Sequence, residues 1–154
     1  MMMRALTIRL ATLGVAAVAL TSCNDSLAPF EGLRYSSAHN SCGPAGGAAT
    51  MIVLANRPIT AGAEPYPSID IYITASVDNL AGKSYQLGGP TASATANKAA
   101  GEIVSDLTGT VTVNAASNTS GRVTGELEAT IPGYGSIHAD FDAAMHNFPI
   151  MYCL

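Results

Sequence analysis

The 154-residue chain has no tryptophan, only three phenylalanines and only three cysteines, and charged residues make up just 12% of it. Seven basic residues stand against eleven acidic ones, and the basic residues gather in no stripe. An acidic chain without such a stripe binds phosphate backbones poorly, so we expect no nucleic-acid partner. Because large aromatics are few and alanines are many, we also expect a thin hydrophobic core.

Motifs for the common catalytic and metal chemistries are also missing. The chain has no Gly-x-Ser-x-Gly nucleophile elbow, no Asp-x-Asp-x-Asp-Gly calcium loop and no Cys-x-x-Cys-His haem sequence. Ser136 and His138 would share one face of a strand, about 6.7 Å apart at their α carbons. No third group that could orient the histidine is evident, and nucleophilic catalysis needs one. We therefore predict a protein that is not an enzyme and that carries no cofactor.

No apolar run is long enough to cross a membrane as a helix. The run at residues 10–20 has about 11 residues, whereas a hydrocarbon core of ~30 Å needs about 20. Two arginines precede this run and small residues follow it, which is the order of a secretory signal peptide. We therefore expect residues 1–22 to be a signal peptide.

The end of that segment, Leu20-Thr21-Ser22-Cys23, resembles the lipobox of bacterial lipoproteins. In that family the cysteine sulfur receives diacylglycerol and the signal peptide is cut before it, so the resemblance implies lipidation of Cys23. Two or three acyl chains anchor a protein stably in a membrane. The resemblance also implies a lipid-anchored place in the bacterial cell envelope, and Asn24 favours the outer membrane, facing the periplasm or the surface. The alternatives are an ordinary signal peptide and an uncleaved anchor.

Lipid on Cys23 would leave two cysteines, Cys42 and Cys153, in an oxidising compartment where disulfides persist. We expect these two to pair and to close a loop of about 110 residues. In the chain-entropy model, a disulfide that closes a loop of about 100 residues stabilises the folded state by about 4.7 kcal/mol. The alternative is a metal or free-thiol role for both. Loss of residues 1–22 also leaves five basic residues against eleven acidic ones, a net charge of −6.

Beyond residue 48 the hydrophobic pattern has a period of two, which is typical of strands with one buried face. Residues 68–76, 109–115, 122–131 and 136–145 alternate most regularly, and clusters of Gly, Pro, Asn and Ser separate the strands. We therefore predict an all-β fold, an antiparallel β-sandwich or flattened barrel of about seven or eight strands.

The segment before this pattern is rich in Gly, Pro and small polar residues, as a flexible tether would be. We expect three parts: a signal peptide at 1–22, a lipid anchor and tether at 23–47, and a β-sandwich domain at 48–154. Phe30, Leu33 and Tyr35 are the residues of the tether that could dock as a first short strand.

The main candidate site is the predicted outer face of the last hairpin. Alternation places Glu126 and Glu128 on one strand and His138, Asp140 and Asp142 on the next. The turn between the strands sets Glu126 opposite Asp140, and Glu128 opposite His138. Opposed like charges destabilise a sheet, and a cation such as Ca²⁺, which prefers several oxygen ligands, would relieve them. The competing interpretation is a solvated acidic face. We assign no metal and keep the five residues as ligand candidates.

Two further groups of residues have the chemistry of binding sites. Soft ligands occur near both ends of the folded part, but they lack the closely spaced Cys and His of a blue-copper loop, so we expect ordinary histidines there. Tyrosines in loops and on wet faces could stack on sugars or on a protein partner, or could simply lie at the edge of the core. The soft-ligand set is His39, Cys42, His146, Met151 and Cys153, and the tyrosines are Tyr66, Tyr72, Tyr85 and Tyr134.

Together these features predict a lipid-anchored cell-envelope protein with a non-enzymatic structural or interaction role. Its partners would be the membrane, through the N-terminal lipid, and an envelope protein or glycan. The alternative function is a carbohydrate- or divalent-cation-binding module. The sequence names no particular ligand for either role.

Overall fold

The computed structural model describes residues 29–43, 46–60 and 65–146. These ranges hold nine strands and one 3-10 turn, η2 (Val77–Asn79). No helix in them has the length and apolar character needed to cross a membrane. The strands are β1 (Tyr35–Cys42), β2 (Ala48–Ala55), β3 (Ser68–Ile73), β4 (Lys83–Leu87), β5 (Ala92–Ala99), β6 (Glu102–Val104), β7 (Thr108–Ser117), β8 (Arg122–Ile131) and β9 (Gly135–Met145).

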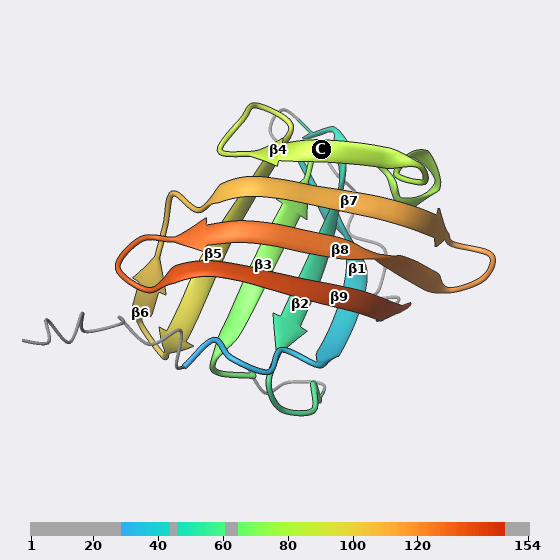
Figure 1. Cartoon of the computed structure of the whole chain (residues 1–154). Coiled ribbons are helices and arrows are strands. Elements are labelled where there is room, and N and C mark those ends of the chain that lie inside the picture. Colours follow the sequence, from blue (N-terminus) through green and yellow to red (C-terminus); the bar gives the residue numbers. More distant parts are fainter. Residues whose placement is uncertain (1–28, 44–45, 61–64, 147–154) are drawn as a thin grey trace, which may run out of the picture.

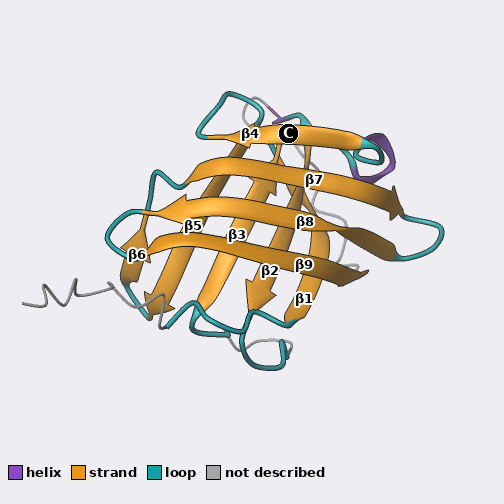
Figure 2. Ribbon diagram, viewed as in Figure 1, coloured by secondary structure: helices purple, strands orange, loops and turns teal. Residues whose placement is uncertain are grey.

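The nine strands form one sheet in the order β4-β7-β8-β9-β1-β2-β3-β5-β6. The sheet curls into a half-barrel, in which β4, β7, β8 and β9 form a front layer that crosses β1, β2, β3 and β5 behind it (Figure 1). Every neighbouring pair is antiparallel except β1 with β9, which is parallel. The predicted all-β class is confirmed, with nine strands in a mixed sheet (Figure 2).

The core lies between the two layers, because each central strand turns alternate residues inward. Apolar side chains occupy these inward positions, and strand β5 offers only alanines there. At one end of the core, Phe30 meets Tyr134 edge to face with ring centroids 5.2 Å apart. Buried residues at the centre include Ile52, Leu54, Ile69, Ile71, Ile73, Val111, Val113, Val123 and Leu127.

Strand β1 lies inside the sheet, between β9 and β2, although its residues fall in the range that the sequence analysis assigned to a tether. It pairs with β2 over its whole length, from Tyr35↔Ala55 to Cys42↔Ala48. The folded body therefore begins no later than Phe30, which is 2% exposed, rather than at residue 48. The sequence YSSAHNSC hides this strand, because only Ala38 marks its inner face with a fully buried apolar side chain.

Two parts of the sequence prediction fall on residues that the structure does not describe. Residues 1–28, with the predicted signal peptide and Cys23, are outside the described ranges, and so are residues 147–154, with Met151 and Cys153. Lipidation of Cys23 and pairing of Cys42 with Cys153 therefore stay predictions.

Candidate functional site

The outer face of the β8–β9 hairpin has the register that the sequence predicts. Glu126 lies opposite Asp140, and Glu128 lies opposite His138. These side chains point away from the core because the intervening residues, such as Leu127, are buried. Alternation along each strand and the length of the turn were enough to predict this arrangement.

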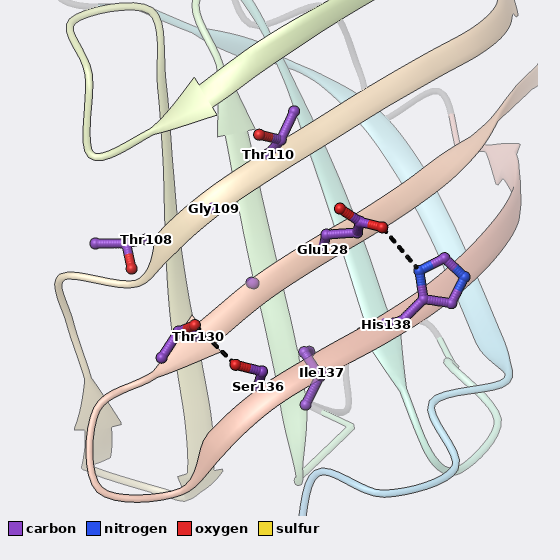
Figure 3. Close-up of a pocket in the computed structure, with 9 residues that line it drawn as sticks. Thr108, Gly109, Thr110, Glu128, Thr130, Ser136, Ile137 and His138 are labelled. Atoms are coloured by element: carbon purple, nitrogen blue, oxygen red, sulfur yellow. Dashed lines mark hydrogen bonds and ion pairs between the residues drawn. The ribbon is translucent and has the colours of Figure 1, made fainter.

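His138 stands between two carboxylates on this face. Its Nδ1 lies 3.8 Å from Oε1 of Glu128 (Figure 3), and its Nε2 lies 3.7 Å from Oδ1 of Asp140. One ligand atom from each of Glu126, His138 and Asp140 lies within 4.8 Å of the other two. Imidazole and carboxylate groups are ligands that divalent cations take in proteins, with water completing the coordination.

Asp142 takes no part in this cluster, because Arg122 binds it instead. Nε of Arg122 donates a hydrogen bond of 2.8 Å to Oδ1 of Asp142, and Nη2 contacts the second carboxylate oxygen. The hydrogen bond from Arg122 is the main cause that lowers the pKa of the Asp142 carboxyl. Of the five predicted ligand candidates, three therefore converge, Glu128 contacts the group through His138, and Asp142 is paired elsewhere.

The polar surface continues across β7 and β4 as cross-strand rows. Thr110 donates to Oε1 of Gln86 at 3.1 Å, and the hydroxyls of Ser84 and Thr112 are 3.0 Å apart. The rows are neutral at the β4 end and carry their carboxylates at the β8–β9 end. In register, they are Gln86–Thr110–Glu128–His138 and Ser84–Thr112–Glu126–Asp140.

A shallow depression of about 470 Å³ lies on this surface (Figure 3). Gly109, Ala129 and Ile137 are cross-strand neighbours on β7, β8 and β9, and they form the floor of the depression. This part of the surface exposes backbone rather than long polar side chains. A Cβ atom at Gly109 would lie 2.1 Å from the carbonyl oxygen of Glu128, so glycine is required there. The polar walls of the depression are Thr108, Thr110, Glu128, Thr130, Ser136 and His138. Sequence reasoning missed this depression, although the alternating Thr-Gly-Thr at 108–110 marks one wall.

A second depression, of about 200 Å³, separates β9 from the segment that leads into β1. We call it the β9 slot; residues 30–33 line one side and residues 136–139 the other. The sequence pattern does not reveal this slot, because residues 30–33 belong to the stretch predicted to be a tether.

The soft-ligand residues that the structure describes, His39, Cys42 and His146, lie on β1 or directly after β9. Burial, and secondarily the neighbouring His146, lower the pKa of His39. The backbone N–H of His146 donates to the carbonyl of Ala38 at 2.8 Å. Cys42 ends β1, and its carbonyl accepts a 2.5 Å hydrogen bond from the hydroxyl of Tyr72. Since Met151 and Cys153 lie outside the described ranges, the completeness of this ligand set is untested.

The described tyrosines are spread over different parts of the sheet. Tyr72 lies on the rear layer, and Tyr134 packs against Phe30. Tyr85 pairs with the buried Val111 on the front layer, and burial raises the pKa of its phenol. These three rings do not form one stacking surface for a sugar.

No family model, curated protein or solved structure matches this chain.

Proposed function

We propose that this chain is a lipid-anchored protein of the bacterial cell envelope, with a non-enzymatic structural or interaction role. The sequence Leu20-Thr21-Ser22-Cys23 after a short apolar run supports the anchor. The observation that carries the interaction role is the front layer, whose outer face is polar across four strands and acidic at one end. A broad surface of this kind contacts a partner through many side chains at once.

The anchor is tested by expressing the full chain in a bacterium with a labelled fatty acid. We expect label on the wild-type protein, recovery with membranes, and accumulation of the uncut form when globomycin blocks lipoprotein processing. Cys23→Ala should carry no label and should leave the membrane fraction. Label that persists in Cys23→Ala would contradict the anchor.

The interaction role is tested by cross-linking on intact cells. We expect a discrete adduct with the wild-type protein that is lost when Glu126 and Asp140 are both replaced by lysine. The matched control is Glu102→Gln on β6, an exposed carboxylate that pairs with Lys98. An adduct that survives the double substitution would place the partner elsewhere and would remove the support that the front layer gives.

The predicted bridge between Cys42 and Cys153 completes this proposal, because an oxidised pair suits the same compartment. Reduction of the mature protein should add the mass of two hydrogens. Two cysteines that alkylate freely in the native protein would contradict the bridge.

Binding of a divalent cation is the second candidate function. It is favoured by the convergence of Glu126, His138 and Asp140 within 4.8 Å. Titration calorimetry with Ca²⁺ and with Zn²⁺ should show heat in the micromolar range for the wild type and for Glu102→Gln. The heat should disappear in Glu126→Gln and in Asp140→Asn. The absence of binding heat with both metals would contradict this function.

A further inference from the structure

Strand β9 is paired along one edge and open along much of the other. Toward β8 it is in register from Ile131↔Gly135 to Arg122↔Ala144. Toward β1 it pairs only at Ser37↔Ala144 and Ala38↔Met145. Within the described parts of the chain, residues 135–141 therefore have no strand partner on the β1 side.

The backbone groups that face this open edge can be identified. The N–H of Asp142 donates to Oγ of Ser36 at 3.3 Å, and the N–H of His146 donates toward β1, whereas the N–H of Met145 donates to Gly121 on the β8 side. N–H and C=O directions alternate along a strand. The N–H and C=O groups of the even-numbered residues 136, 138 and 140 therefore point away from β8, and residues 136 and 138 line the opening on that side.

The opening is the β9 slot. The segment that leads into β1 passes beside β9 without joining it (Figure 1), and the depression of about 200 Å³ lies between them. An unpaired row of N–H and C=O groups beside an opening is a template for one more strand. Addition of an extended peptide to such an edge is a common form of recognition.

Charge on the rim of the slot selects the kind of segment. Glu31 lies on one wall and His138 on the other. On the outer face, carboxylate oxygens of Glu128 and Asp140 lie 3.8 Å and 3.7 Å from the ring nitrogens of His138. Arg122 is already held by Asp142, and Arg34 is the only cation in the segment 30–34. A second copy of this acidic chain would bring further negative charge to the same place. Electrostatic complementarity therefore favours a basic partner.

We propose that the open edge of β9 binds an extended, lysine-rich segment of an envelope partner protein, which adds a strand by pairing with Ser136, His138 and Asp140. This inference rests on the proposed interaction role and names the class of partner. Main-chain hydrogen bonds to β9 supply the pairing, and the alternate side chains of the added strand meet the acidic rim.

The probe is a fluorescein-labelled peptide, Lys-Val-Lys-Val-Lys-Val-Lys, added to the full-length protein in detergent. The control peptide has the same side chains and charge, but every peptide nitrogen is methylated. It therefore cannot donate backbone hydrogen bonds to a strand. We expect the unmethylated peptide to bind at least tenfold more tightly by fluorescence anisotropy. Equal binding of the two would show that only charge attracts them and would overturn strand addition.

Hydrogen exchange locates the pairing on the protein. On binding, the amides of residues 136, 138 and 140 should exchange at least tenfold more slowly, while the amide of Asp142, already bonded to Ser36, serves as the reference. Peptide binding without slower exchange at these three amides would overturn the proposal.

Charge variants complete the test. Glu31→Gln combined with Asp140→Asn should weaken peptide binding at least tenfold, and Glu102→Gln on β6 should leave it unchanged. Wild-type affinity in the double variant would overturn the proposed basic partner. If the peptide fails to bind while the cross-linked adduct of intact cells persists, the docking site is wrong and the interaction role stands.

Discussion

Glu126 on β8 and Asp140 on β9 are direct cross-strand partners, so the hairpin holds two carboxylates face to face. Antiparallel strands favour opposite charges at such positions. Arg122, on the same strand as Glu126, supplies an opposite charge, but it binds Asp142 rather than Asp140. Strand β9 therefore carries one carboxylate that is compensated, Asp142, and one that faces a like charge, Asp140.

This difference predicts opposite effects of two similar substitutions in metal-free buffer. Asp140→Asn should raise the free energy of unfolding by about 0.5 kcal/mol, because it removes a like-charge repulsion. Asp142→Asn should lower the free energy of unfolding, because it breaks the pair with Arg122. Urea denaturation of both variants measures the two changes. A change of the same sign in both would contradict the assignment of the charges.

Asp78 should contribute to the acid limit of stability. Its carboxylate accepts hydrogen bonds of 2.9 Å from the backbone N–H and from the side-chain amide of Asn118. These bonds lower the pKa of Asp78 below its ordinary value of 3.8. The folded state then binds the proton less readily than the unfolded state. The stabilisation is complete above the unfolded pKa and is lost as the pH falls through the folded pKa.

Asp78→Asn should therefore flatten the decline of stability on the acid side, below about pH 4. Denaturation midpoints at several pH values from neutral to strongly acid measure this. The comparison variant is Asp106→Asn, which removes one carboxylate from an exposed loop position. An unchanged profile in Asp78→Asn would show that Asn118 does not hold the carboxylate in solution.

Removal of the hydroxyl group should have opposite effects on stability at two tyrosines. The hydroxyl of Tyr85 is buried and has no hydrogen-bond partner among the described residues, whereas the hydroxyl of Tyr72 donates to the carbonyl of Cys42. Tyr85→Phe should raise the free energy of unfolding by about 1 kcal/mol, and Tyr72→Phe should lower it by about 1 kcal/mol. Thermal or urea denaturation measures both. A loss of stability in Tyr85→Phe would mean that its hydroxyl finds a partner in solution.

Gly125 is required by close packing. A Cβ atom there would lie 2.1 Å from the carbonyl oxygen of Thr112 and 2.6 Å from Cζ of Phe141. The carbonyl of Thr112 cannot move without breaking the β7–β8 pairing. Gly125→Ala should therefore lower the free energy of unfolding by about 3 kcal/mol. Gly101→Ala has open space around its Cβ and should cost only about 1 kcal/mol, from its positive φ. Urea denaturation of both compares them, and equal costs would contradict the clash.

The regular strands and the acidic pairing were predictable because one face of each strand is buried. Along β8, β9 and the last five residues of β3, buried residues alternate with more accessible ones, and a shift of one residue would expose the core side chains. That constraint made the opposition of Glu126 and Asp140 readable from spacing alone. Strand β1 escaped prediction because its polar residues lie on both faces, so the hydrophobic pattern does not mark it.

The amino-acid sequence by itself determined the all-β class, the alternating strands and the carboxylates of the last hairpin, because short-range periodicity reports which face is buried. It also carries the predicted lipidation at Cys23, which is a local motif. Tertiary structure alone decided that β1 joins β9 in parallel, that Asp142 pairs with Arg122, and that residues 135–141 have no partner on the β1 side among the strands that the structure describes. The open edge depends on where two strands about a hundred residues apart meet, and no local pattern encodes that meeting.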